Sequence, residues 1–356
     1  MTRASPLAAV HEDAGARFTE FGGWEMPVQF DSIRAEHAAV REAVGRFDVS
    51  HMGEVAVRGP DARDLLDGLT TNDVAALAPG EAQYAMLTDE DGTIIDDTVV
   101  YRPPTDPPSG APVADADYLF VPNAGPDEAA VARFREHREA WGLDAAVENA
   151  TEEYALVAVP TDADIADTPR FGARYAAVGG HPTLVSRTGY TGEDGVEILC
   201  GWDAARDVWA AIDCPPCGLG ARDTLRTEMG FLLSGQDFHP EENPRNPYEA
   251  GVGFAVDLDT DFVGRDALAD IAEAGPAELF VGHRLEERGV PRHGYDIRVG
   301  GEAVGEVTSG TMSPTLEAPI GLGYLPVAHA DPGTRVAVVV RGDPKEARVV
   351  DPPFLE

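Results

Sequence analysis

Two adjacent carboxylates, Asp96 and Asp97, lie inside the segment GTIIDDTVVY, residues 92–101, whose other residues are mostly β-branched or aromatic. Removing an isolated charge from water is costly, so a buried carboxylate needs a partner, a shifted pKa or a catalytic role. In a strand the two side chains point to opposite faces, and both have apolar neighbours. The pattern leaves open which acid faces a pocket, or whether one is a surface acid and the other a hydrogen-bonded structural acid.

A third acid, Glu197, ends a glycine-rich segment, SRTGYTGEDGVEIL, residues 186–199. Glycines at positions 189, 192 and 195 allow tight turns and a close approach of the backbone to a ligand. A half-buried carboxylate there could accept two parallel N–H bonds from an amidine-like edge, which a pterin or guanine ring presents. The structural alternative is a glutamate that accepts bonds from loop amides.

Arg222 lies beside Asp223 at the start of an expected helix, in GLGARDTLR, residues 218–226. The helix dipole favours an anion at this end and disfavours a cation. We therefore expect a nearby carboxylate or an anionic ligand to compensate the charge of Arg222.

The composition is strongly acidic, with 63 Asp plus Glu residues against 27 Lys plus Arg, a formal net charge of −36, and Lys345 as the one lysine. Such a surface suits a protein that stays hydrated in multimolar salt, where the Debye length is roughly 3 Å or less. A disordered acidic chain is excluded, because 43% of the residues are hydrophobic and the acids are dispersed among patterned segments. Most carboxylates are therefore expected to be solvated surface groups.

Several partner classes are not expected. The chain has no basic stripe to neutralise the phosphates of a nucleic acid. No segment approaches the ~18 apolar residues that cross a bilayer, and the N-terminus lacks a secretory apolar core, so we expect a soluble cytoplasmic protein with no membrane contact. Cys214 and Cys217 have the spacing of half a zinc site, but without a second ligand pair we expect no metal.

The elements that must position these residues show mixed α and β patterns. Residues 31–44 have the apolar spacing of an amphipathic helix, and a second helix follows Gly218-Leu-Gly220, carries Leu225, Met229 and Leu232 on one face, and stops by Gly235. Residues 51–57 are expected to form a strand. Residues 82–88 and 92–101 are expected to form a hairpin joined by DEDG.

The remaining segments predict loops and a further domain. Proline-rich sequence at 102–110 and 160–169 indicates exposed loops. From about residue 276, short β runs are broken by Gly-Gly, Ser-Gly and Pro, which is typical of a separate barrel or sandwich.

Seven blocks, in order over nearly the whole chain, resemble the glycine cleavage T-protein family of aminomethyltransferases. They are FGGWEMP (21–27), VGRFDVSHMGE (44–54), TND (71–73), GTIIDD (92–97), SRTGYTGEDGVEI (186–198), GLGARDTLRTE (218–228) and SGTMSPTL (309–316). A single short motif would be weak, but seven blocks in register are specific.

The resemblance implies a three-domain, cloverleaf-like α+β fold with antiparallel sheets and a C-terminal β-barrel or jelly-roll-like domain. The expected domains are a discontinuous folate-binding domain of residues 1–50 plus 150–270, a second domain of residues 51–149 that carries Asp97, and a barrel of residues 276–356.

The resemblance also implies a reaction. A lipoylated H-protein supplies an aminomethyl group on its lipoyl arm, ammonia leaves, and the carbon passes to tetrahydrofolate in a central channel, giving 5,10-methylene-tetrahydrofolate. By position, Asp97 matches the essential carboxylate, which is expected to orient and electrostatically support folate N5 and N10. Asp96 is then the structural acid.

Other matched positions imply a folate site. Glu197 matches the family's pterin-binding carboxylate, and Arg222 matches a folate-site arginine. Further positions expected to contact the folate are Met52, Tyr84, Asn123, Tyr190 and Arg292.

Two competing functions stay open at the level of the sequence. A tetrahydrofolate-dependent demethylase of a methylated sulfonium or amine shares this fold and pterin site but does not need the lipoyl protein. A non-catalytic folate-binding protein would tolerate the loss of Asp97. A third kind of relative, which serves iron–sulfur enzymes, has a Lys-Gly-Cys-Tyr block that this chain lacks.

Overall fold

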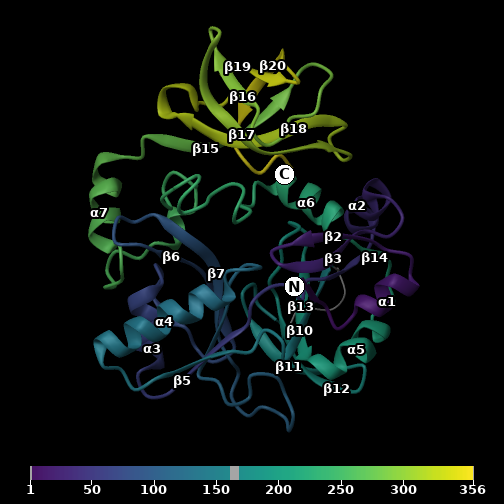
Figure 1. Cartoon of the computed structure of the whole chain (residues 1–356), viewed down its shortest axis with the longest axis vertical. Coiled ribbons are helices and arrows are strands. Elements are labelled where there is room, and N and C mark those ends of the chain that lie inside the picture. The colour runs from purple at the N-terminus through teal and green to yellow at the C-terminus, as the bar shows by residue number, and fades with distance from the viewer. Residues whose placement is uncertain (1, 161–167, 356) are drawn as a thin grey trace.

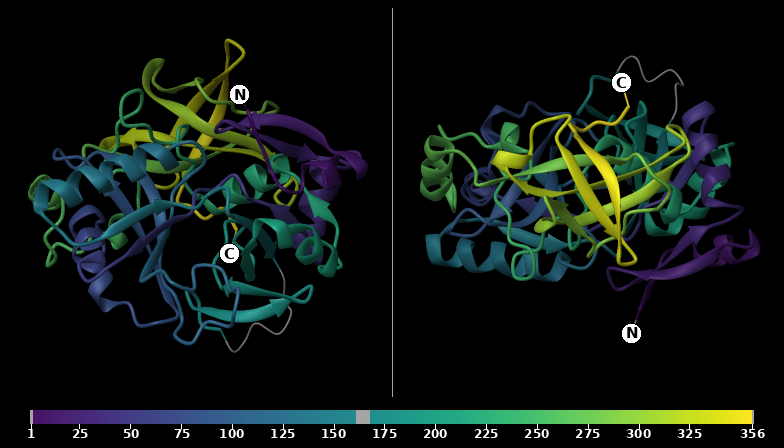
Figure 2. Two further views of the ribbon diagram at one scale, coloured as in Figure 1. Left: turned by 60° about the horizontal axis from the view of Figure 1, so that its bottom comes forward. Right: turned by 90° about the horizontal axis from the view of Figure 1, so that it is seen from above.

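A computed structural model describes residues 2–160 and 168–355 of the chain (Figure 1). A barrel at the top of the view lies over two lobes that each combine sheet and helices, and the view from above in Figure 2 shows the barrel strands crossing over both. The predicted α+β fold with a C-terminal barrel is confirmed. The loop expected at 160–169 lies largely outside the described residues.

One lobe is a five-stranded antiparallel sheet covered by two helices. Its strands, in spatial order, are β6 (Glu81–Thr88), β7 (Ile94–Arg102), β8 (Tyr118–Val121), β5 (Val55–Arg58) and β9 (Ala146–Asn149). The helices are α3 (Ala62–Leu69) and α4 (Asp127–Trp141). Leu65, Leu66 and Phe134 pack with Phe120 into one core, and the rings of Phe120 and Phe134 stack with centroids 4.5 Å apart.

The second lobe is built on a six-stranded sheet. Its strands, in spatial order, are β11 (Ala173–Val178), β12 (His181–Ser186), β13 (Gly195–Gly201), β10 (Tyr154–Pro160), β4 (Arg46–Asp48) and β14 (Pro216–Cys217). The helices of this lobe are α1 (Ala8–Asp13), α2 (Ile33–Glu42), α5 (Ala205–Ala211) and α6 (Leu219–Met229). A small sheet of β1 (Arg3–Ala4), β3 (Trp24–Gln29) and β2 (Arg17–Phe21) lies beside them.

The barrel closes completely. Its strands, in order around it, are β15 (Glu278–Leu285), β18 (Ala318–Pro326), β17 (Glu302–Ser313), β16 (Asp296–Val299), β19 (Arg335–Val340) and β20 (Asp343–Val350). Closure comes from β15, which pairs with β18 on one side and with β20 on the other. Helix α7 (Arg265–Ala274) leads into it. The predicted domain boundaries at residues 50, 150 and 276 stay a prediction.

The hairpin predicted around the acid pair is confirmed as β6 and β7. Asp97 lies opposite Met86, and Asp96 lies opposite Leu87. Strand alternation puts Asp97 on the face of Val99 and Tyr101, which pack with residues of the six-stranded sheet in a core between the two lobes. The face with Asp96 is turned toward α3 and α4.

Two local predictions were wrong. Residues 51–54 are not part of a strand, which begins only at Val55, because the backbone turns at Met52, where its N–H donates to Val49 O at 3.0 Å. The second predicted helix, α6, ends at Met229, before Leu232, because Gly230 adopts a left-handed φ of 71° and terminates it. The helix predicted within residues 31–44 is confirmed as α2, and the Ser32 side chain caps it by accepting from Ala35 N.

Helix α6 joins the second lobe to the barrel through buried ions. Arg226 donates to Asp237 Oδ2 at 2.7 Å and to Ser309 Oγ of β17 at 2.7 Å. Two residues further along, Glu228 accepts from His37 Nε2 at 2.9 Å and from Arg41 Nη2 at 2.7 Å, both from α2. Ser313 of β17 donates to the same carboxylate at 2.5 Å.

Across the part of the chain that the structure describes, every helix is too short or too polar to cross a membrane.

Candidate functional site

The two aspartates of β7 are held by one asparagine. Asn123 Nδ2 donates to Asp97 Oδ1 at 2.6 Å and to Asp96 Oδ1 at 2.9 Å, and its backbone N–H donates to Asp96 Oδ2 at 3.0 Å. Tyr84, on the neighbouring strand β6, donates its hydroxyl to Asp97 Oδ2 at 2.6 Å. Ser234 donates to Asp96 Oδ1 at 2.9 Å. Although the acids start from opposite faces of the strand, one amide group binds both.

Burial raises the pKa of both carboxyl groups. Burial, followed by the charge of Asp97, raises the pKa of Asp96 to about 7. Burial also raises the pKa of Asp97, while the hydrogen bonds from Tyr84 and Asn123 oppose that increase. Asp96 is almost fully buried, whereas Asp97 keeps some exposure. Of the two, Asp97 is therefore the carboxylate that can reach a ligand.

A second group of predicted residues lines a small cleft on the six-stranded sheet. Tyr190, Glu197 and Arg222 contribute to its wall, together with Phe47 and Ala158. Thr188 Oγ1 donates to Glu197 Oε2. Burial raises the pKa of Glu197, and the Thr188 hydrogen bond and the charge of Arg222 oppose this.

The charge of Arg222, for which a nearby carboxylate or an anionic ligand was predicted, is only partly compensated by protein groups. Its guanidinium lies over the ring of Tyr190, 4.3 Å from the centroid, and burial lowers its pKa while the charge of Glu197 opposes this. Within residues 2–160 and 168–355, the Arg222 side chain makes no hydrogen bond. A half-buried cation with unused donors suits a ligand with acceptor oxygens.

The two groups of residues are close enough to interact. Burial raises the pKa of Tyr190, and the charge of Asp97 adds to that increase. Met52 is partly buried against the core between the lobes. Arg292 is exposed and donates to Gly310 O at 2.7 Å, a contact within the barrel region, and it does not line the cleft. The structure therefore joins six of the eight predicted positions in two groups, Asp97, Tyr84 and Asn123 at the acid pair and Tyr190, Glu197 and Arg222 in the cleft.

Three further residues of the site were not singled out from the sequence. Thr188 lies within the SRTGYTGEDGVEI block, but its spacing alone does not identify it as the donor to Glu197. Ser234 is 138 positions from Asp96, and no local pattern predicts that contact. His51 is fully buried, and burial followed by the charge of Arg222 lowers its pKa to about 3, so it is neutral.

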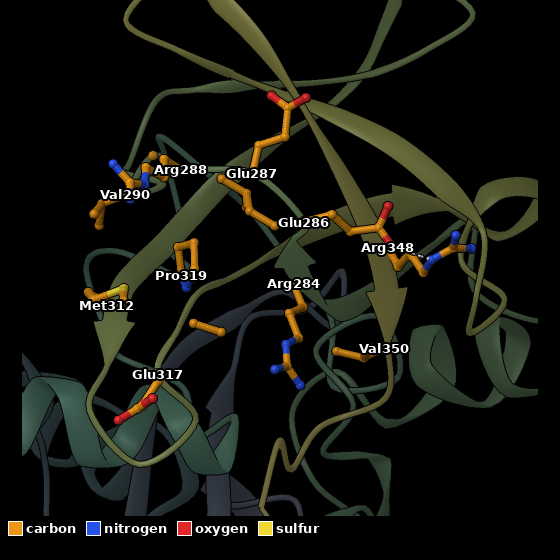
Figure 3. A pocket seen from close by; sticks show the side chains of 13 residues that line it. Arg284, Glu286, Glu287, Arg288, Val290, Met312, Glu317, Pro319, Arg348 and Val350 are labelled. Carbon is orange, nitrogen blue, oxygen red and sulfur yellow. Dashed lines mark hydrogen bonds and ion pairs between the residues drawn. The ribbon is translucent and has the colours of Figure 1, made fainter.

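A second pocket, larger than the cleft, lies away from these residues. It has a volume of about 780 Å3 and is on the outside of the barrel, where its lining includes Arg284, Glu287, Arg288, Glu317 and Arg348 (Figure 3). Arg348 donates to Glu286 Oε1 at 2.6 Å there. The cavity shares no lining residue with the cleft or the acid pair, so it forms no part of this site.

The fold and the site together define a transferase of the glycine cleavage T-protein class. Residues 7–260 match the GCVT N-terminal domain, and residues 280–356 match the glycine cleavage T-protein C-terminal barrel domain. A crystal structure of the glycine cleavage system aminomethyltransferase T from Bartonella henselae is similar, with a TM-score of 0.89, 30% sequence identity, and coverage of 100% of this chain and 99% of that one.

Relatives that match this chain over nearly their full length are named as aminomethyltransferases. A probable aminomethyltransferase of Natronomonas pharaonis is 60% identical and covers 99% of both chains. The aminomethyltransferase of Bacillus subtilis is 40% identical and covers 100% of both. The chain therefore belongs to the aminomethyltransferase, or glycine cleavage T-protein, family. This confirms the family and the aminomethyltransferase function predicted from the seven blocks.

Proposed function

We propose that the protein transfers the one-carbon unit of an aminomethyl group, carried on the lipoyl arm of an H-protein, to tetrahydrofolate. The observation that carries the proposal is the geometry of Asp97, a partly exposed carboxylate fixed by two donors at 2.6 Å, Tyr84 and Asn123. Such a fixed charge stabilises a cation that develops during a reaction without reorganising first.

The cleft beside Asp97 has the groups that a reduced folate requires. In this proposal, Glu197 accepts the ring N–H and the amino group of the pterin through its two oxygens. Arg222 supplies donors to acceptor oxygens of the same ligand, and its ring contact with Tyr190 fixes its plane. These residues bind and orient the acceptor, so that N5 and N10 approach Asp97.

The proposed transfer exchanges two bonds of the donor for two bonds of the acceptor. The C–S and C–N bonds of the donor S–CH2–NH2 group break, and two C–N bonds form to N5 and N10 of tetrahydrofolate. The two protons lost from these nitrogens appear on the departing thiol and on ammonia. Positive charge develops on the carbon as the C–S bond breaks, and the carboxylate of Asp97 supports that charge.

The test runs the reaction in reverse with purified protein in concentrated KCl. Consumption of 5,10-methylene-tetrahydrofolate is followed when ammonia and dihydrolipoyl H-protein are added, separately and together. Dependence on both additions is the expected result. If the protein binds folate, shows no such turnover and instead demethylates a methylated sulfonium or amine, the demethylase function replaces the proposed one.

A further inference from the structure

An exposed aromatic residue lies beside the acid pair. Phe254, in the short helix η3 (Gly253–Ala255), is 78% exposed, the highest value for a large apolar side chain among the described residues. Its ring stacks on that of Tyr84, with the centroids 6.0 Å apart and the planes at 24°. Tyr84 in turn donates to Asp97. The exposed ring is thus one aromatic contact away from the proposed catalytic carboxylate.

The position of Phe254 is fixed by the TND block at residues 71–73, for which the proposed folate site gives no role. Thr71 Oγ1 donates to Ala255 O at 2.7 Å and accepts from Met86 N at 3.0 Å, so it ties η3 to strand β6. Asn72 Nδ2 donates to Tyr84 O at 3.0 Å, on the same strand. One short loop therefore holds both rings of the stacked pair.

Exposure alone does not mark a site, because single apolar residues are common on protein surfaces. Phe254 differs from the other exposed large apolar residues, such as Val327 at 47%, in what it contacts. It extends the aromatic surface of Tyr84 outward from Asp97. A substrate that reaches Asp97 from solvent over these rings would contact an apolar surface. Aromatic rings also make favourable contacts with sulfur atoms and with cations.

We infer that Tyr84 and Phe254 form an aromatic shelf that receives the sulfur-bearing end of the lipoyl arm, an inference that rests on the proposed function. The aliphatic carbons of the arm bury apolar surface on the rings. Its sulfur atoms make favourable contacts with aromatic side chains. The aminomethyl nitrogen, when protonated, is attracted to the ring faces and to the carboxylate of Asp97.

The shelf recognises the arm itself and not the protein that carries it. Phe254 should therefore affect reactions of the H-protein-borne arm and of free dihydrolipoamide alike. Replacing Phe254 should leave tetrahydrofolate binding unchanged, because Phe254 does not line the cleft that contains the proposed folate residues Glu197 and Arg222.

The experiment compares Phe254→Ala and Phe254→Trp with the wild type in the reverse reaction, using dihydrolipoyl H-protein and free dihydrolipoamide in turn. We expect Phe254→Ala to lower kcat/KM roughly tenfold for both, mainly through KM, as the loss of a sulfur–aromatic contact with its buried area predicts. Phe254→Trp should retain most of the wild-type value. The control Val327→Ala removes another exposed apolar side chain, on the barrel, and should have no effect.

Each other outcome overturns the inference. An unchanged kcat/KM for Phe254→Ala shows that the ring contacts no part of the arm. A loss confined to the H-protein-borne arm assigns Phe254 to contact with the body of the carrier protein. A weakened tetrahydrofolate Kd assigns it to the folate site. Inactivity of the wild type would instead overturn the proposed function, and this inference with it, so the two failures are distinct.

Discussion

Replacing Asp97 with asparagine removes one negative charge from the centre of the site while preserving the shape of the side chain. In the wild type, Tyr84 and Asn123 both donate to this carboxylate at 2.6 Å. An amide has one acceptor oxygen and an NH2 group, so either the Tyr84 hydroxyl or the Asn123 amide would face the NH2 group, which is itself a donor. The variant therefore loses a charge and one hydrogen bond, without opening a cavity.

The size of the effect follows from the charge. A cation about 4 Å from a carboxylate gains about 4 kcal/mol at an effective dielectric constant near 20. Because Asp97 keeps some exposure, we discount this to about 3 kcal/mol, which lowers turnover by roughly 100-fold to 1,000-fold. Tetrahydrofolate should still bind, since Glu197 and Arg222 are unchanged.

The assay is the reverse reaction in concentrated KCl, together with the Kd of tetrahydrofolate from calorimetry. Glu90→Gln is the matched control, because Glu90 is an exposed acid in the turn of the same hairpin and its replacement removes the same charge. A second readout is the pKa of Asp96, which should fall below about 7 once the charge of Asp97 is gone. Turnover within roughly threefold of the wild type would refute the reasoning and leave Asp97 a structural residue.

Three further predictions concern binding, stability and pH dependence. Glu197→Gln should weaken tetrahydrofolate binding roughly tenfold to 100-fold, because a charge-assisted hydrogen bond contributes about 1.5–3 kcal/mol; an unchanged Kd in calorimetry would move the pterin elsewhere. Glu228→Ala should lower the free energy of unfolding by about 3 kcal/mol or more, because Arg41 and His37 lose their buried acceptor. Denaturant unfolding measures this, and a loss below about 1 kcal/mol contradicts it. Asp96→Asn should flatten the dependence of stability on pH. The pKa of Asp96, about 7 in the folded protein, exceeds that of an unfolded aspartate, about 3.9, so its contribution is complete in acid and is lost as the pH rises through 7. If the free energy of unfolding changed equally with pH in the variant and the wild type between about pH 4 and pH 7, this assignment to Asp96 would be wrong.

Sequence patterns predicted the parts of the fold that are determined by residues close together in the sequence. The DEDG turn between two β-rich runs predicted the β6–β7 hairpin, and the Gly and Pro breaks after residue 276 predicted the barrel. The error at residues 51–54 has a physical cause, since alternating polarity cannot distinguish a strand from a buried turn that leads into one. The end of α6 was missed because the left-handed turn that terminates the helix comes already at Gly230, before Leu232, although Gly235 is also left-handed.

The site depended on contacts between distant segments, which local patterns cannot predict. The motif blocks predicted Asp97, Glu197 and Arg222 as a set, and the structure brings them near one another, but their roles stay predictions. The bond from Ser234 to Asp96 joins segments 138 residues apart. The stacking of Phe254 on Tyr84 likewise depends on where η3 packs, and Thr71 decides that from another segment.

Closure of the barrel affects how the protein self-associates in concentrated salt. An open sheet exposes unpaired backbone groups at its edge strands, where a second molecule can add a strand and begin an aggregate. A net charge of −36 would normally keep molecules apart, but concentrated salt screens repulsion beyond roughly 3 Å. In the barrel, β15 pairs on both sides, so the ring of strands offers no edge to a neighbour. Resistance to self-association through these six strands therefore comes from their topology, which no salt concentration weakens.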